Sequence, residues 1–239
     1  MDIRCLRPYA PPPVPARAFP IAQQFEQSLG VRALKIANAC FGGIYHQVTV
    51  LEPSQLPLVG PGILICNHVN FLDPILIQAH VTRTITWMMA REYYDMPVLG
   101  RIFQTVEAIP VDRDGRDVSA TRAAMRALDE GRILGLFPEG GLQEPGARAL
   151  KPFQPGVGML ALRSAAPVYP AYIDGTHRGK SFAQACLLRQ HAVLAFGEAL
   201  SPVKSAGRRP GIEAVTAQFQ GSVEGLKKQV DHFRFSGWG

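Results

Sequence analysis

The chain has 239 residues, of which 47% are hydrophobic and 18% charged, and its formal net charge is +6 at pH 7. This length suits one large domain, and this composition is typical of a globular protein, which excludes a mainly disordered chain. The excess of basic residues favours anionic partners, namely phosphorylated metabolites, an acidic membrane surface or nucleic acid, and charge alone does not choose among them.

Residues 1–20 (MDIRCLRPYAPPPVPARAFP) are rich in proline and lack the apolar core of a secretory signal, so we expect an extended or disordered tail. No stretch holds about 18 uninterrupted apolar residues, so no transmembrane helix is predicted. The four cysteines are scattered, without a C-x-x-C pair. We therefore expect neither a zinc site nor a disulfide framework, no other metal, and a cytoplasmic location.

Two amphipathic helices are predicted near the ends of the chain. Apolar residues recur at helical spacing over residues 21–45, which predicts an N-terminal helix there. A second apolar stripe predicts a C-terminal helix within residues 206–239. Each helix is a candidate for peripheral contact with a membrane surface, and each could instead pack its stripe on its own domain.

Short apolar segments alternate with helical ones over residues 46–205, which we expect to form one domain. The expected strands are residues 48–51, 62–66, 85–89, 107–111, 132–137 and 168–173, with a late strand within residues 191–200. Helices are expected at residues 73–81, 117–131 and 155–165. Such alternation predicts an α/β fold, a single domain with a mainly parallel central sheet flanked by helices.

The apolar run ICNHVNFLDPILI, at residues 65–77, is interrupted in its middle by polar residues that include His68 and Asp73. Because aspartate is a good helix N-cap and proline suits the first helical position, Asp73 and Pro74 predict the start of a helix. His68 then lies on a strand-to-helix turn at the carboxyl end of a strand, where open α/β sheets bind ligands. An active site at the carboxyl ends of the strands is therefore expected.

The spacing of His68 and Asp73 is compatible with two roles. In one, Asp73 only caps its helix and His68 is a hydrogen-bonded histidine in a loop. In the other, Asp73 orients the imidazole and stabilises its protonated form, so that His68 removes a proton from a hydroxyl or thiol. A turn permits the contact that the second role needs, and the rest of the chain must decide.

Three further stretches follow the H-x-x-x-x-D pattern in order. Residues 100–116 contain IPVDR, residues 132–143 contain FPEGG, and residues 166–176 contain VYPAYI. Together with NHVNFLD, these blocks resemble the glycerolipid acyltransferase family, which includes the lysophosphatidate acyltransferases. The resemblance extends over residues 48–175, and four blocks in order are far more specific than any one of them.

The resemblance implies that residues 46–205 are an acyltransferase domain. It would move a fatty acyl group from a thioester, on coenzyme A or acyl carrier protein, to a hydroxyl of 1-acylglycerol-3-phosphate or a related lysophospholipid. His68 would be the general base, with Asp73 as its orienting partner. No cofactor is implied beyond the acyl-CoA or acyl carrier protein co-substrate, and the expected setting is phospholipid biosynthesis at a membrane surface.

By the same resemblance, Arg113, Glu139 and Gly140 belong to the acceptor site. An arginine suits a phosphate because its planar fork donates two parallel hydrogen bonds, although Arg113 could equally pair with a neighbouring aspartate in a solvated turn. Glu139 could accept hydrogen bonds from glycerol hydroxyls. Gly140 would let the backbone approach the acceptor closely.

The third block departs from the family pattern. The pattern often continues FPEGTRS, whereas here Gly141 and Leu142 replace the threonine and the arginine. A cation that would help to hold an acceptor phosphate is therefore missing, unless Arg148 or Lys151 replaces it from the following loop. The acceptor head group stays open at this point.

The same residues are compatible with other functions. A thioester hydrolase would use the same His68 to activate water, and a non-catalytic lipid-binding protein would keep only the pocket. Cys66 precedes His68 by two residues and could form a nucleophilic Cys–His pair, or be a small buried core residue. Nucleic acid is not an expected partner, because the chain has no arginine-rich helix interleaved with aromatic residues.

Overall fold

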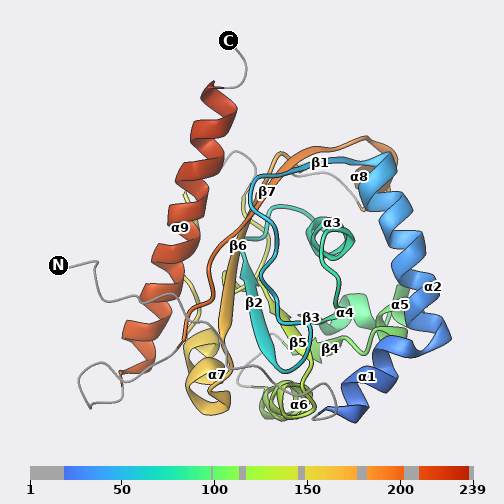
Figure 1. The fold of residues 1–239 in the computed structure, drawn as a ribbon, viewed down its shortest axis with the longest axis vertical. Coiled ribbons are helices and arrows are strands. Elements are labelled where there is room, and N and C mark those ends of the chain that lie inside the picture. Colours follow the sequence, from blue (N-terminus) through green and yellow to red (C-terminus); the bar gives the residue numbers. More distant parts are fainter. Residues whose placement is uncertain are drawn as a thin grey trace.

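A seven-stranded sheet forms the centre of the computed structural model, which describes residues 19–97, 99–112, 117–144, 149–176, 182–201 and 210–236 (Figure 1). The strands are β1 (Gln47–Val50), β2 (Gly62–Cys66), β3 (Ile85–Ala90), β4 (Ile109–Val111), β5 (Ile133–Leu136), β6 (Val168–Asp174) and β7 (His191–Phe196). All seven predicted strands are present, because each is a short apolar run bounded by polar, glycine or proline residues.

The sheet is mainly parallel, as predicted. Its strand order is β1-β7-β6-β2-β5-β3-β4, and β6 and β7 form its antiparallel pair. The other neighbouring strands pair in parallel, so β1 and β7 run opposite to the rest. The central strand β2 is buried along its whole length, and its carboxyl end leads into the His68 turn.

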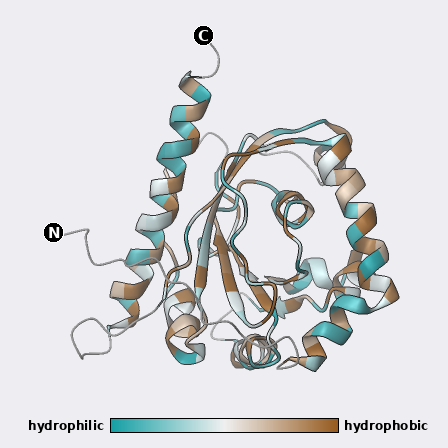
Figure 2. Cartoon of the chain, viewed as in Figure 1, coloured by the Kyte–Doolittle hydropathy of each residue, from teal (hydrophilic) through white to brown (hydrophobic). Residues whose placement is uncertain are grey.

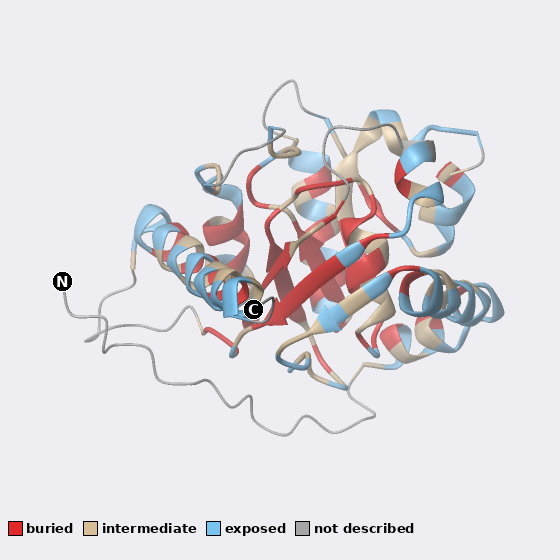
Figure 3. Cartoon of the chain, turned by 90° about the horizontal axis from the view of Figure 1, so that it is seen from above, coloured by how far each residue is buried: buried red, intermediate tan, exposed pale blue. Residues whose placement is uncertain are grey.

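Helices cover both faces of this sheet. They are α1 (Pro20–Gln27), α2 (Leu29–Asn38), the π-helix η3 (Ala39–Tyr45), α3 (Asp73–Ala79), α4 (Arg91–Tyr94), α5 (Leu99–Thr105), α6 (Val118–Asp129), α7 (Gly156–Ser164), α8 (Phe182–Leu187) and α9 (Ile212–Ser236). One apolar cluster joins α6, α7 and α9 to one face, and a second joins α3 to the other. In Figure 3 the buried residues concentrate in the sheet and in the inner faces of these helices. The fold is therefore the predicted single α/β domain.

The N-terminal helical region differs from the prediction of one continuous helix over residues 21–45. It consists of three successive helical segments, α1, α2 and η3. The first break lies at Ser28, whose backbone is extended and whose hydroxyl accepts a hydrogen bond from the N–H of Val31 at 3.4 Å. Serine is a strong N-cap, so it starts a new helix where the apolar spacing alone would continue the old one. The tail predicted for residues 1–20 falls almost wholly outside the described residues.

The apolar stripe of α9 faces its own domain. Val215, Phe219, Val223, Leu226 and Val230 are buried and join the cluster on the α6 and α7 face of the sheet. Figure 2 shows the outer side of α9 as largely hydrophilic. The apolar stripe that made the C-terminal helix a candidate for membrane contact is therefore buried against the sheet and its neighbouring helices.

A buried arginine ties the N-terminal helices to the sheet. The guanidinium of Arg83 donates to the carbonyl oxygens of Gly60 at 2.7 Å, Gly131 at 2.8 Å and Pro57 at 3.3 Å. Its side chain also lies 3.7 Å from the carboxylate of Glu26, on α1. One cation thus satisfies carbonyl groups from two loops that flank the sheet and one carboxylate.

Replacing Arg83 with methionine is expected to lower the free energy of unfolding by roughly 3 kcal/mol, because buried acceptors lose their donor. Urea unfolding followed by circular dichroism measures this change. Arg122→Met, on the exposed side of α6, is the matched control and should stay within about 0.5 kcal/mol of the parent. Equal midpoints for the two variants would contradict the structural role of Arg83.

Candidate active site

The His68 side chain is held by Asp73 in the turn between β2 and α3. His68 Nδ1 lies 3.0 Å from Asp73 Oδ2, and the Asp73 side chain is fully buried. The same oxygen accepts hydrogen bonds from the backbone N–H of Val69 at 2.6 Å and of Asn70 at 2.7 Å. With Nδ1 as the donor to the carboxylate, Nε2 carries the lone pair. The imidazole is 18% exposed, so a substrate hydroxyl can approach it.

Asp73 does not act as the N-cap that the sequence predicted. The cap position is Leu72, Asp73 is the first residue of α3, and Pro74 lies in its first turn. The carboxylate instead turns back to the N–H groups of the preceding turn, which converge on Oδ2. Its second oxygen, Oδ1, is buried without a hydrogen-bond partner among the described residues.

Asn67 anchors this turn to the neighbouring strand β6. Its side-chain amide donates to the carbonyl of Ile173 at 2.9 Å, and its side-chain oxygen accepts from the Ile173 N–H at 2.8 Å. The pair continues the ladder between β2 and β6 by one side chain. No role was predicted for Asn67, although the polar amide directly after a fully apolar strand is the signal that could have indicated one.

Glu139, in the FPEGG loop, lies beside His68. Its Oε1 accepts from the backbone N–H of His68 at 3.0 Å, and its Oε2 accepts from that of Lys151 at 2.8 Å. The side-chain amide of Gln143 lies 3.2 and 3.1 Å from the two oxygens. Glu139 is buried, and its carboxylate connects the backbone of His68 to Gln143 and to Lys151.

The other residues of this loop complete the frame. The backbone N–H of Gln143 donates to the carbonyl of His68 at 2.8 Å, so loop and turn are bonded in both directions. Gly140 has φ = 74°, a left-handed conformation in which a side chain would be strained, and this accounts for the glycine. Gln143 was not predicted, because nothing in a single sequence indicates a backbone contact of this kind.

The cations proposed for the acceptor site are described only in part. Arg113 and Arg148 lie outside the described residues. The ammonium group of Lys151 donates to the carbonyl of Leu142 at 2.7 Å, so it lies at the loop position where the family pattern has its arginine. The structure therefore brings together His68, Asp73, Glu139 and Gly140 of the predicted site.

Cys66 is fully buried two residues before His68, and its thiol lies 3.4 Å from the side-chain oxygen of Asn67. Burial, together with the Asp73 and Glu139 carboxylates, raises the pKa of the Cys66 thiol well above its usual value. A thiol in such surroundings is a poor nucleophile, so the alternative of a Cys–His pair loses its support.

The described residues show neither a metal-binding cluster nor a membrane-spanning helix. Within them, no group of three or more histidine, cysteine, aspartate or glutamate side chains could hold a metal ion. Across the same residues, no helix combines the length and the apolar character that crossing a membrane requires.

The match to a known family covers most of this fold and the whole His68 turn. The family model described as Acyltransferase matches residues 47–174, which is more than half of the chain. The chain therefore belongs to the acyltransferase family. This agrees with the resemblance drawn from the four sequence blocks.

Two relatives of known name are similar to this chain in sequence. The 1-acyl-sn-glycerol-3-phosphate acyltransferase of Bacillus subtilis (strain 168) is 28% identical over 149 residues, which are 62% of this chain and 71% of the relative. The protein of the same name from Helicobacter pylori is 29% identical over 113 residues, 46% of this chain and 47% of the relative. The chain thus spans about half of the second relative.

A solved structure supports the fold. The crystal structure of the 1-acyl-sn-glycerophosphate (LPA) acyltransferase PlsC from Thermotoga maritima superposes with a TM-score of 0.61. The two chains are 20% identical, and the match covers 82% of this chain and 81% of the other. At this identity the likeness concerns the fold alone.

Proposed function

We propose that the protein transfers a fatty acyl group from an acyl thioester to the free hydroxyl of 1-acylglycerol-3-phosphate or a closely related lysolipid, in phospholipid biosynthesis. The observation that carries this proposal is the partly exposed imidazole of His68, held by the buried carboxylate of Asp73 at the carboxyl end of β2. The names of the relatives from Bacillus subtilis and Helicobacter pylori support the choice of acceptor.

The proposed reaction needs one base and no covalent enzyme intermediate. Nε2 of His68 removes the proton of the acceptor hydroxyl as its oxygen attacks the thioester carbonyl. The tetrahedral intermediate then collapses, the C–O ester bond is kept, the C–S bond breaks, and the imidazolium returns the proton to the thiolate. The Asp73 carboxylate stabilises the imidazolium between these steps. The donor is acyl-CoA or acyl carrier protein, and no other cofactor or metal is proposed.

Arg113, Gly140 and Glu139 are the residues proposed for the acceptor site. Arg113 would hold the phosphate through its planar fork, and Gly140 would let the backbone approach the glycerol. Glu139 has protein donors on both of its oxygens, so its first role is to position the His68 turn. A direct contact between Glu139 and a glycerol hydroxyl would have to replace one of these hydrogen bonds, because they already occupy the roughly four lone-pair sites of the carboxylate.

Acyl transfer is tested by thiol release from a long-chain acyl-CoA and from an acyl carrier protein, with and without lysophosphatidate, with separation of the lipid products. The proposal expects release that depends on lysophosphatidate and yields a diacyl product. Release without an acceptor, yielding free fatty acid, would identify a thioester hydrolase. If the protein binds lysolipid and turns over neither donor, it is a non-catalytic lipid-binding protein.

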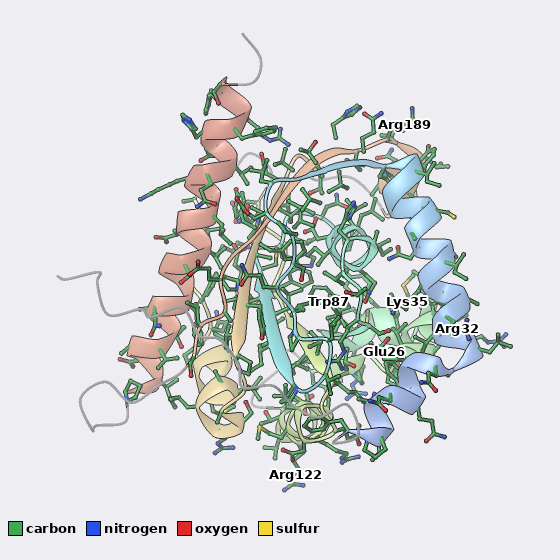
Figure 4. The ribbon with its side chains drawn as sticks, viewed as in Figure 1. Glu26, Arg32, Lys35, Trp87, Arg122 and Arg189 are labelled. Atoms are coloured by element: carbon green, nitrogen blue, oxygen red, sulfur yellow. The ribbon has the colours of Figure 1, made fainter. Side chains whose placement is uncertain are left out.

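The N-terminal helices are proposed as the surface that meets the membrane. Leu29 and Ile36 on α2 are 85% and 67% exposed, and Ile44 on η3 is 73% exposed. Figure 4 shows the Arg32 side chain reaching outward from α2. Exposed apolar side chains beside a cation suit the boundary of an anionic bilayer. We propose peripheral binding there, together with the cytoplasmic location expected from the cysteine pattern.

The double variant Leu29→Asp with Ile36→Asp is expected to lower the affinity for vesicles of phosphatidylglycerol and phosphatidylethanolamine by at least about tenfold, because two apolar side chains no longer enter the bilayer. Cosedimentation over a range of lipid concentrations measures this affinity. Phe235→Asp, at an 87% exposed position near the end of α9, is the matched control and should bind as the parent does. Equal losses in both variants would contradict the proposed surface.

A further inference from the structure

Three aromatic rings stack on one another from the sheet to His68. The Trp87 indole, on β3, lies parallel to the Phe137 ring, with centroids 4.7 Å apart and an interplanar angle of 5°. Phe137, directly after β5, lies in turn against the imidazole of His68, at 3.9 Å and 12°. Figure 4 shows Trp87 in the interior of the molecule, beside the sheet. The candidate base is thus the outermost ring of a continuous stack.

A glycine makes room for the innermost ring. Trp87 pairs with Gly135 in the register between β3 and β5. A Cβ atom at residue 135 would lie 2.4 Å from an atom of the indole and 2.5 Å from the Ile85 side chain, closer than such atoms can approach. Only glycine therefore lets the indole lie across β5 in this position. Trp87 is 8% exposed, so the surrounding core holds it firmly.

The stack restricts rotation of the imidazole about its terminal torsion, which the hydrogen bond to Asp73 does not fix by itself. The bond from Nδ1 to the carboxylate holds one edge of the imidazole, and rotation about the terminal torsion of a histidine has broad energy wells. A ring stacked on one face restricts that rotation, because tilting the imidazole would break the contact. Edge and face together set the direction of Nε2, the atom that would remove the proton.

We infer that Phe137 is a positioning residue for His68, and that Trp87 and Gly135 hold Phe137 in place. This inference rests on the proposed role of His68 as general base. Displacing a catalytic group by about 1 Å can reduce a rate a hundredfold. Fixing the plane of the imidazole should therefore change kcat by a measurable factor. The ordinary alternative is that the three rings are core packing, and removing one would then change stability alone.

Phe137→Leu keeps apolar volume and removes the ring, and Phe137→Tyr keeps the ring. We expect kcat for acyl transfer to fall about tenfold in the leucine variant, with KM for donor and acceptor within about twofold of the parent. The tyrosine variant should retain kcat within about threefold. Gly135→Ala should lower kcat in the same direction as Phe137→Leu, because it displaces the indole that supports Phe137.

A spectroscopic measurement tests whether Phe137 stacks on the imidazole in solution, and the change in kcat at constant KM tests whether the stack positions it. A stacked aromatic ring shifts the carbon-bound protons of the imidazole upfield, and the resonances of His68 are assigned by their absence in His68→Gln. They should move downfield in Phe137→Leu and stay near the parent positions in Phe137→Tyr. Phe219→Leu removes a buried ring from the opposite face of the sheet and should change neither these resonances nor kcat.

Parent-like kcat in Phe137→Leu, or unmoved His68 resonances in that variant, would overturn the inference. An equal loss of kcat in Phe137→Leu and Phe219→Leu would also overturn it, since general loosening would then explain the effect. The resonances are recorded without substrate. An inactive parent would therefore count against the proposed function, whereas unmoved resonances would count against the contact between Phe137 and the imidazole.

Discussion

Replacing His68 with glutamine is expected to lower kcat for acyl transfer to lysophosphatidate by about a thousandfold or more, since a positioned general base contributes factors of this order. The glutamine side chain can still donate a hydrogen bond to Asp73, so the turn keeps its buried partner while Nε2 is lost. The expected result is a folded protein, with a parent-like unfolding midpoint, that binds both substrates and does not turn them over.

His232→Gln serves as the control for this variant, because His232 lies on the exposed side of α9. Its kcat should equal that of the parent. If His68→Gln retained a tenth or more of the parental kcat, His68 would not be the base. A loss of thiol release both with and without the acceptor would show that one base serves transfer and hydrolysis alike.

The sheet was predictable because the sequence changes polarity at the ends of its strands. Runs such as residues 62–66 and 133–136 are wholly buried, and the residues beside them change sharply in polarity. The short helices α4, α5 and α8 were not predicted, because each makes at most two turns and shows no periodicity to recognise. The break at Ser28 shows the converse, since one capping residue outweighed a helical spacing that continues through it.

The candidate site was predictable where both partners lie close in the sequence. His68 and Asp73 are five residues apart on one turn, so a single stretch of sequence contains their geometry. The partners of Glu139 come from positions 68, 143 and 151, and most of them are backbone groups that every residue type carries. Such contacts depend on how loops meet in three dimensions.

The aromatic stack was unpredictable for a related reason. The innermost ring of the stack depends on the register that sets Trp87 opposite Gly135. A single sequence does not show the register between strands that are not consecutive in the chain. The glycine in RILGLF looks like an interruption of a strand when it is seen alone. In the folded chain it is the space into which the indole fits.

Asp73→Asn is expected to lower kcat by roughly a hundredfold or more while leaving the fold intact, because it removes a charge and little else. Asparagine can keep an oxygen at the Oδ2 position, where His68, Val69 and Asn70 donate. Its amide group then occupies the Oδ1 position, whose oxygen has no partner among the described residues and therefore loses no hydrogen bond. The imidazolium formed during the reaction would no longer face a carboxylate.

Comparison with Asp73→Ala separates two roles of the Asp73 carboxylate, namely shaping the turn and stabilising the charged imidazole. Alanine removes both oxygens, so three buried donors lose their acceptor and the free energy of unfolding should fall by roughly 2 to 4 kcal/mol. If Asp73 only shapes the turn, asparagine should keep kcat close to the parental value and alanine alone should be impaired. If it stabilises the charged imidazole, the asparagine variant should unfold near the parental urea midpoint and still lose its activity, and steady-state kinetics beside urea unfolding of both variants measures this difference.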